Sequence, residues 1–301
     1  MAAIPLTRVG PDKGRNYEYH WTGQFLQAYF LSDVGRKREH NEDACVLCAP
    51  DNESLAEERG ILFAVADGMG GASAGEFASR LTLQTLIDEY YGGRAGAIPA
   101  RLRRAIERCN QRVFEEAEHN PDYRGMGTTI SALVVKDEWG YIAQVGDSRV
   151  YVARNDSLFQ QITQDHSLVA EQIREGYLTE EEARNHSLRN LITRAVGIKE
   201  TIETDLFALK MKQGDTILMC SDGLSNMVTD EEMQESLTNG NLQGAGRVLV
   251  GRALESGGSD NITVVLVRVV DQPARGYVDD GAEIVRIGRP GILGSLKKLI
   301  P

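Results

Sequence analysis

The sequence has 301 residues, of which 42% are hydrophobic and 26% charged, values typical of a soluble globular protein with a sizeable core. Its 44 acidic and 33 basic side chains give a net charge of −11, which argues against a general binder of nucleic-acid backbones. No apolar run reaches the ~18 residues of a membrane span, and the N-terminus lacks a signal-peptide pattern. We therefore expect a cytoplasmic protein without a membrane span.

Four cysteines are too few for a disulfide framework and favour a reducing compartment. Cys45 and Cys48 form a C-x-x-C pattern within the apolar run ACVLCA. On a strand, a spacing of three places the two side chains on opposite faces of the sheet. We interpret them as buried thiols rather than as a metal or redox pair.

In chain order, residues 1–25 show no clear period, and we expect an irregular lead-in there. Apolar and β-branched runs predict strands, and a 3.6-residue apolar period predicts helices. The acidic stretch 51–60 is expected to be a loop and residues 165–194 a polar segment with helical stretches. The C-terminal tail is residues 271–301, and its basic end GILGSLKKLIP (291–301) is expected to be disordered or loosely packed, with a short amphipathic docking piece as the alternative. Strands are predicted at residues 26–32, 43–50, 60–67, 128–137, 139–147, 149–156, 157–163, 215–223 and 260–270, and helices at 74–90, 100–120, 229–237 and 242–257.

Short turns separate the strands of the 128–163 region, which indicates antiparallel hairpins. Thr229 and Glu232 have the spacing of a helix N-terminal capping box. Strands and long helices are grouped and do not alternate regularly, so we predict an α+β layered fold with mostly antiparallel sheets.

Aspartates recur where apolar strands end. One such Asp, with a Gly beside it, is usually a turn former, but five in one chain are harder to explain in that way. If the strand ends converge, several carboxylates lie close together, and cations must balance their charge. The five stretches are REHNEDA (38–44), VADGMGG (65–71), QVGDSRV (144–150), CSDGLSN (220–226) and GGSDNIT (257–263).

A cluster made of oxygen ligands suits Mg²⁺ or Mn²⁺, and nothing His-rich or Cys-rich in the sequence points to zinc. Two such ions about 3.5–4 Å apart can bind phosphate oxygens and activate a water for phosphoryl transfer. Gly68, after Asp67, would let the strand turn sharply and leave a backbone carbonyl open to a metal.

In this order, these stretches resemble the metal-dependent serine/threonine protein phosphatases of type 2C, the PPM family, in their bacterial form. The resemblance covers about residues 30–270. It implies a four-layer α-β-β-α sandwich, in which two antiparallel sheets are flanked by helices, and a phosphatase domain at 26–270. The matching segments are SDVGRKREHNEDA, FAVADGMGG, GTT, GDSRVY, TQDHSL, ITRAVG, CSDGL and SDNITVVLV.

The resemblance implies a role for each matching residue. Asp67 would bridge two metals, with the Gly68 carbonyl on the second, and Asp222 and Asp260 would complete the first. A water that bridges the metals would attack phosphorus in line, without a phospho-enzyme. The cofactor would be Mn²⁺ or Mg²⁺, two ions in the core site.

Further residues match the rim of the family's site. Glu42 and Asp43 match an acidic pair that holds metal-bound waters and the second metal, and Arg38 matches the guanidinium that grips the substrate phosphate. Asp147, together with Asp222, matches the site of a weaker third metal. For Asn261, which follows Asp260, we expect a supporting role behind the metal ligands.

Two positions depart from part of the family. Met69 stands where some members have a histidine that is the proposed general acid, so a metal-bound water or another group would protonate the leaving alcohol. Asn226 stands where some members have a further Asp, which would weaken a third metal. His166 and His186 flank the segment 165–194, where the family has a mobile flap; either could serve as an acid, although solvated or locally hydrogen-bonded histidines are the commoner case.

The resemblance predicts hydrolysis of phosphoserine and phosphothreonine in proteins, in a bacterial-type circuit with a cognate Ser/Thr kinase, by a monomer. A non-catalytic binding module is the first alternative, and the retained Asp67, Asp222 and Asp260 speak against it. A small phosphoester or acyl phosphate as substrate stays open, because metal ligands do not encode the leaving group. The sequence contains no P-loop and no Cys-x5-Arg loop, which excludes a P-loop nucleotide enzyme and cysteine-based phosphatase chemistry.

Overall fold

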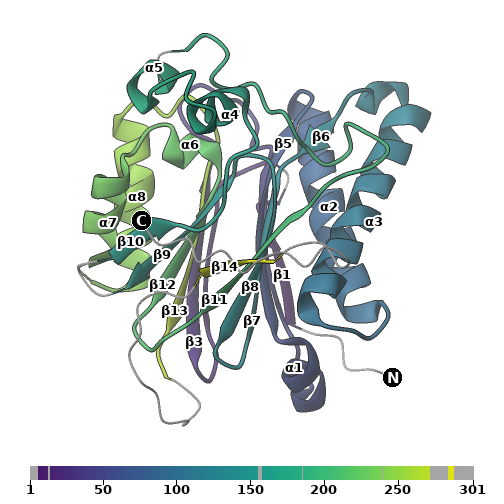
Figure 1. Cartoon of the computed structure of the whole chain (residues 1–301), viewed down its shortest axis with the longest axis vertical. Coiled ribbons are helices and arrows are strands. Elements are labelled where there is room, and N and C mark those ends of the chain that lie inside the picture. Colours follow the sequence, from purple (N-terminus) through teal and green to yellow (C-terminus); the bar gives the residue numbers. More distant parts are fainter. Residues whose placement is uncertain are drawn as a thin grey trace.

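The computed structural model describes residues 6–12, 14–154, 158–184, 186–238, 240–271 and 284–287. Two antiparallel sheets pack against each other, and helices cover their outer faces (Figure 1). The first sheet has the order β1 (Leu6–Gly10), β4 (Asp43–Ala49), β5 (Ile61–Met69), β7 (Ile130–Lys136), β8 (Trp139–Val145), β11 (Asp205–Lys210) and β14 (Ile284–Arg286), with β6 (Gly127–Thr128) paired to β5. The second has the order β10 (Leu158–Gln161), β9 (Arg149–Arg154), β12 (Thr216–Cys220), β13 (Ile262–Val269), β3 (Leu26–Asp33) and β2 (Tyr17–Thr22).

The central strands are apolar along their whole length because both of their faces are covered. In β4 every residue is buried: Cys45 and Leu47 face the second sheet, and Val46 and Cys48 face the helices. Both cysteines are free thiols. The predicted placement of the pair on opposite faces, as buried thiols, is therefore confirmed.

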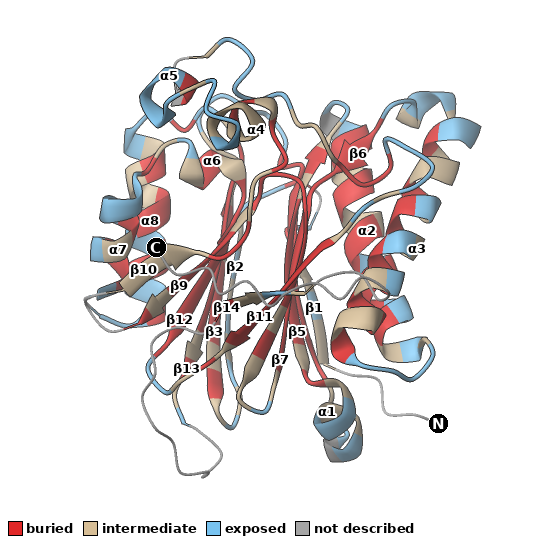
Figure 2. Ribbon diagram, in the orientation of Figure 1, coloured by how far each residue is buried: buried red, intermediate tan, exposed pale blue. Residues whose placement is uncertain are grey.

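Helices α2 (Ala72–Gly92) and α3 (Ile98–His119) cover the first sheet, and α7 (Asp230–Thr238) and α8 (Leu242–Glu255) cover the second. Buried residues therefore form three apolar layers, one between the sheets and one under each helix pair (Figure 2). The predicted four-layer sandwich is confirmed. The capping box is also present, because the Thr229 backbone N–H donates to Glu232 Oε2 at 2.9 Å and the Glu232 N–H donates to Thr229 Oγ1 at 3.3 Å.

The expectation of an irregular lead-in is wrong for most of residues 6–22. β1 pairs with β4 in the first sheet, and β2 pairs with β3 in the second. In β2 the aromatic side chains of Tyr17, Tyr19 and Trp21 alternate with polar residues and pack on the core between the sheets. This two-residue alternation is a strand signal, and it lies within the sequence NYEYHWT.

Other elements also differ from the prediction. Residues 51–60, expected to be a loop, contain helix α1 (Glu53–Arg59), whose N-cap Asn52 accepts a hydrogen bond from the Leu55 N–H. The sequence interpretation assigned neither β11 nor the short 3₁₀ helix at Pro121–Tyr123. Within the tail, Ile284–Arg286 form β14, whereas the basic stretch 291–301 lies outside the described residues.

The segment 165–194, called the flap segment from here on, contains α4 (Leu168–Arg174) and α5 (Glu180–Arg184), as its helical patches predict. It lies at the end of the sandwich where α6 (Asp222–Ser225) begins (Figure 1). None of the helices among the described residues is sufficiently long and apolar to cross a membrane.

Candidate active site

The first sheet brings two predicted ligands directly opposite each other. Asp43 is the first residue of β4 and Asp67 lies near the end of β5, and the antiparallel register pairs the two positions. Their carboxylates therefore belong to the same end of the sheet. Asp147 lies at this end too, in the turn from β8 of the first sheet to β9 of the second.

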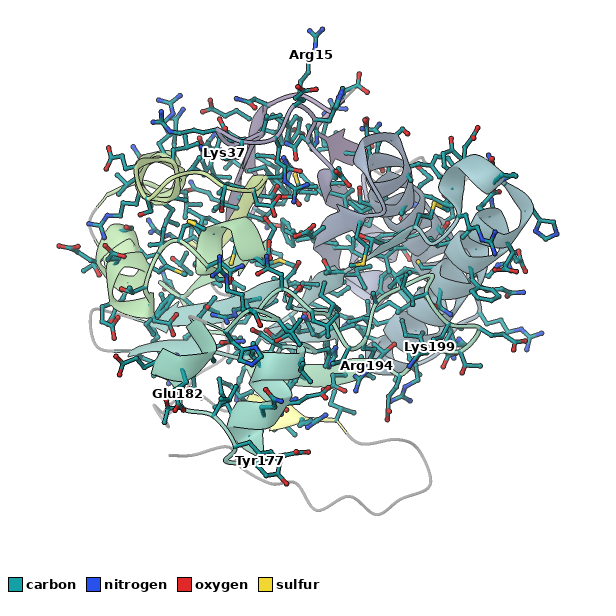
Figure 3. The ribbon with its side chains drawn as sticks, turned by 90° about the horizontal axis from the view of Figure 1, so that it is seen from above. Arg15, Lys37, Tyr177, Glu182, Arg194 and Lys199 are labelled. Atoms are coloured by element: carbon teal, nitrogen blue, oxygen red, sulfur yellow. The ribbon has the colours of Figure 1, made fainter. Side chains whose placement is uncertain are left out.

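The second sheet contributes two more carboxylates. Asp222 opens α6 directly after β12, and Asp260 precedes β13, which is the neighbour of β12. An added Cβ at Gly223 would lie 1.9 Å from the Asn261 carbonyl oxygen, so only glycine permits this approach of the two segments. Figure 3 looks down on this end of the molecule, with Lys37 on one side and Tyr177 and Glu182 of the flap segment on the other.

The segment GTT fixes the backbone of Asp67. The Asp67 N–H donates to Thr129 Oγ1 at 2.9 Å, and the Asp67 carbonyl accepts from Thr128 Oγ1 at 2.8 Å and from the Thr129 N–H at 2.9 Å. Sequence reasoning matched this segment to the family without assigning a role to its threonines. Their place at the start of the strand that pairs with β5 explains the contacts.

Gly68 is required for a reason other than the expected one. Strand β5 continues through Gly68 to Met69, so the sharp turn predicted at Gly68 is wrong; Gly70 and Gly71 have the positive φ values, 124° and 91°. A Cβ on Gly68 would lie 2.1 Å from the Gly75 carbonyl oxygen of α2. The glycine allows α2 to contact the end of the strand directly.

Arg38 lies at the mouth of the site with its side chain 44% exposed. Its Nη2 donates to Asp260 Oδ2 at 2.9 Å, and its Nη1 lies 3.6 Å from Glu42 Oε1. Burial opposes the charged form, but these two carboxylates raise the pKa of Arg38. The guanidinium is therefore a fixed positive group beside the carboxylate cluster, and it keeps exposed surface for a ligand.

Asn261 connects the loop of Arg38 to β13. Its Oδ1 accepts from the Glu42 N–H at 2.8 Å, and its Nδ2 donates to the carbonyls of Val34 and His40, each at 2.9 Å. The amide thus holds both ends of the loop. These contacts orient the Glu42 backbone and the loop that carries Arg38.

The site carboxylates affect one another. Burial, and then the charge of Asp43, raises the pKa of Asp67 well above its ordinary value, and burial raises that of Asp147. Burial also raises the pKa of Asp43 to about 7 and that of Asp222 to about 6. Burial raises the pKa of Glu42 as well. So much uncompensated negative charge is unfavourable unless a cation binds.

Two buried carboxylate oxygens, Asp43 Oδ1 and Asp147 Oδ1, have no hydrogen-bond partner among the described residues. The other oxygen of Asp43 accepts from Ser221 Oγ at 2.7 Å, so this carboxylate is held in place while its free oxygen stays available. Within the described ranges, no three or more His, Cys, Asp or Glu side chains lie as they stand in an arrangement that could hold a metal. The donor chemistry, which consists of carboxylate and carbonyl oxygens, fits a hard cation.

Asn226, which departs from part of the family, and the two histidines each have identified hydrogen-bond partners. Asn226 Nδ2 donates to Asp222 Oδ2 at 3.1 Å, which partly occupies that carboxylate. His166 is buried, and its Nδ1 accepts from the Gly146 N–H at 3.0 Å, whereas His186 Nδ1 accepts from the Leu188 N–H at 3.2 Å. His186 is thus a local hydrogen-bonding residue, whereas His166 is buried and binds the turn that carries Asp147.

A cleft of about 620 Å³ lies beside the carboxylates, between the flap segment and α6. Asp147 and Asp222 form part of its wall, and Val169 and Ile173 of α4 form another part. Arg149, also in the wall, is bound by Asp165 through Nε at 2.9 Å and Nη2 at 2.8 Å. The cleft is therefore continuous with the site and large enough for side chains of a peptide.

Comparison with known proteins gives consistent matches. Residues 35–247 match the family model described as "Protein phosphatase 2C". The chain is 40% identical over 248 residues to the serine/threonine phosphatase stp of Listeria welshimeri, which covers 80% of this chain and 95% of that protein. It is similar to the Streptococcus agalactiae serine/threonine phosphatase structure, with a TM-score of 0.75 and 35% identity over 81% of this chain and 100% of that one.

It also resembles the catalytic domain of the phosphatase PstP in complex with two manganese ions, with a TM-score of 0.71 and 37% identity over 82% of this chain and 99% of that one. The layered fold, the carboxylates at one end of the sandwich and the arginine beside them agree with these matches. The family match spans well over half of the chain. The chain therefore belongs to the protein phosphatase 2C family.

Proposed function

We propose that the chain is a protein serine/threonine phosphatase that hydrolyses phosphoserine and phosphothreonine monoesters with the help of divalent metal ions. Its family, and the names of the relatives at 35–40% identity, support the substrate class. The observation that carries the metal dependence is the pair of buried, unpartnered oxygens Asp43 Oδ1 and Asp147 Oδ1.

Asp67, the Gly68 carbonyl, Asp222 and Asp260 are the residues proposed to hold two core ions, with Glu42 and Asp43 beside the second. A pair of such ions neutralises phosphate charge and lowers the pKa of a water so that it can attack phosphorus. The protein orients these groups by fixing the Asp67 backbone between threonines and the Asp43 carboxylate against Ser221.

Arg38 is proposed to bind the substrate phosphate. Its position at the mouth, held by Asp260 and Glu42, leaves exposed guanidinium surface toward an incoming dianion. Met69 offers no proton, so the leaving alcohol takes its proton from water or from another group. Manganese is the proposed metal, since a related structure contains two manganese ions; Mg²⁺ has the same ligand preference.

Asp147 and Asp222 are proposed to hold a weaker third ion. The free Oδ1 of Asp147 supports this assignment, and we expect the hydrogen bond from Asn226 to Asp222 to lower the affinity for this ion. As partners we propose phosphorylated proteins and a cognate Ser/Thr kinase. We also propose that the chain acts as a monomer in the cytoplasm.

The decisive experiment measures phosphate release from a phosphothreonine peptide after EDTA treatment, with and without Mn²⁺. We expect metal-dependent release that falls about 10²–10³-fold in Asp222→Asn, the size of loss typical for one key electrostatic group. Asp51→Ala, an exposed aspartate outside the site, is the control and should keep the wild-type rate.

A folded protein that releases no phosphate with any divalent ion would exclude this function and favour the binding module. Release from a small aryl phosphate but not from the peptide would exclude protein substrates and favour a small phosphoester.

A further inference from the structure

The C-terminal strand β14 lies on the edge of the first sheet and continues it beyond β11. Arg286 pairs with Phe207, Val285 with Ala208 and Ile284 with Leu209, and the Ile287 N–H donates to the Leu206 carbonyl at 2.8 Å. Ile284 is buried in the layer between the sheets. The strand is therefore anchored both by backbone pairing and by an apolar side chain.

Arg286 projects from this strand toward the base of the flap segment. Its Nη2 donates to Asp205 Oδ2 at 2.6 Å, and its Nη1 donates to Gln164 Oε1 at 3.2 Å, just before the flap segment begins. The guanidinium carbon also lies 6.0 Å from the centre of the Phe207 ring, a cation–π distance. These three contacts fix the direction of a side chain that is 48% exposed.

Asp205 connects Arg286 to both ends of the flap segment. It is 7% exposed, and its Oδ1 accepts from Arg194 Nη1 at 3.2 Å, while its Oδ2 lies 3.5 Å from His166 Nε2. The two ends also bind each other, because the Thr193 N–H donates to the His166 carbonyl at 2.8 Å. In Figure 3 the yellow strand β14 lies next to Arg194.

His166 extends this network to the carboxylate site. The backbone N–H of His166 donates to the Gly146 carbonyl at 3.0 Å, and its ring nitrogen Nδ1 accepts from the Gly146 backbone N–H at 3.0 Å. Gly146 precedes Asp147 and has a φ of 103°, so this turn has a conformation that few other residues adopt. The base of the flap segment and the turn of Asp147 are therefore one hydrogen-bonded unit.

We propose that Arg286 is a positioning residue, through which the C-terminal strand β14 holds the base of the flap segment and thereby shapes the cleft for the peptide substrate. An exposed ion pair alone contributes little, but here the acid is buried and is shared with two flap residues. Strand β14 adds to the edge of the first sheet in the way that an extended peptide adds to a sheet edge, mainly through backbone hydrogen bonds.

The test compares Arg286→Gln, Arg286→Lys and, as a matched control, Arg247→Gln. Arg247 is an exposed arginine of α8 that binds Glu18 Oε1 at 2.9 Å, and Glu18 belongs to β2, an edge strand of the second sheet, whereas β14 belongs to the first. Amide hydrogen exchange of the full chain is followed at residues 163–168 and 191–196. Exchange there should be at least about fivefold faster in Arg286→Gln and unchanged in Arg247→Gln, because the flap base loses a local tether.

Arg286→Lys keeps the charge but can reach only one of the two acceptors, so it should recover part of the protection. The second readout rests on the proposed function: the KM for a phosphothreonine peptide should rise about threefold to tenfold in Arg286→Gln, with kcat unchanged within twofold. Exchange needs no activity, so a failure of the proposed function and a failure of this inference give different results.

The proposal is overturned if Arg286→Gln exchanges at the flap base like Arg247→Gln. It is equally overturned if exchange rises uniformly over both sheets, which would indicate a purely structural role, or if exchange changes while the peptide KM does not.

Discussion

Arg38 gives a prediction at the scale of a single residue. Its guanidinium shares two carboxylates, Asp260 and Glu42, and a planar fork suits these partners and a phosphate dianion. Arg38→Lys keeps the charge but loses the fork, so we expect kcat/KM on the phosphopeptide to fall about tenfold, and about 10²-fold or more in Arg38→Ala. Steady-state kinetics at saturating Mn²⁺ measures both. Equal kcat/KM values for Arg38→Lys and the wild type would show that the planar fork of the guanidinium is unimportant for activity.

Asp205 gives a prediction about pH. Burial would raise its pKa, but the neighbouring His166, Arg286 and Arg194 outweigh that cost and lower the pKa well below its ordinary value. A carboxyl whose pKa is lowered in the folded state stabilises the fold above its unfolded pKa of about 4, and loses this contribution as pH falls through the folded value. Asp205→Asn should therefore cost about 2 kcal/mol at pH 7 and progressively less below pH ~4.

Urea unfolding of the metal-free protein at pH 7, 5 and 3 measures this difference. Asp51→Asn, an exposed aspartate, is the control and should change stability little at any of these pH values. A stability gap for Asp205→Asn that is as large at pH 3 as at pH 7 would contradict the assignment.

Individual residues of the site were partly predictable. Five acidic stretches at strand ends are visible in the sequence, because each follows or precedes an apolar run. Their partners are not visible in this way. Ser221 reaches Asp43 across 178 positions, and Asn261 reaches the Glu42 backbone across 219, so these contacts depend on the registers of two sheets. Only the three-dimensional arrangement determines them.

At the scale of elements, β5 and α2 meet at two glycines. A Cβ on Gly68 would lie 2.1 Å from the Gly75 carbonyl oxygen, and a backbone atom cannot move aside as a flexible side chain can. Gly68→Ala should therefore destabilise the protein by about 2–3 kcal/mol. Gly251→Ala is the control: this helical glycine has nothing within 4 Å of an added Cβ, so alanine should stabilise by about 0.5–1 kcal/mol. If urea unfolding shows that both substitutions change the free energy of unfolding in the same direction, the explanation by steric contact at Gly68 is refuted.

Some elements of the fold are predictable from local sequence patterns, and others are not. The long amphipathic helix α3 and the β-branched strand β13 lie close to their predicted bounds, because burial on one face or both produces a clear apolar pattern. Helix α1 was missed because its sequence ESLAEER is mostly polar, so that its start depends on the Asn52 cap. β14 has only three residues and depends on β11 for its pairing, so no local pattern marks it.

At the scale of the whole molecule, metal binding should be linked to stability. A ligand that binds only the folded state at 100 times its Kd adds about 2.7 kcal/mol, which for a domain of this size raises the Tm by roughly 5–10 °C. We expect this rise when Mn²⁺ is added to EDTA-treated protein in differential scanning fluorimetry. Asp67→Asn should lose most of the rise. A Tm independent of Mn²⁺ would mean that the carboxylates bind no ion in the folded state.

The two N-terminal strands have a consequence for the molecule as a whole. β1 covers the outer edge of β4 in one sheet, and β2 covers that of β3 in the other. Without them, both strands would present unpaired backbone N–H and C=O groups, and β4 is buried along its whole length. Exposed apolar edges of this kind pair with other chains. A fragment that starts at residue 26 would therefore tend to self-associate through two edges, one on each sheet, even if its catalytic groups were complete.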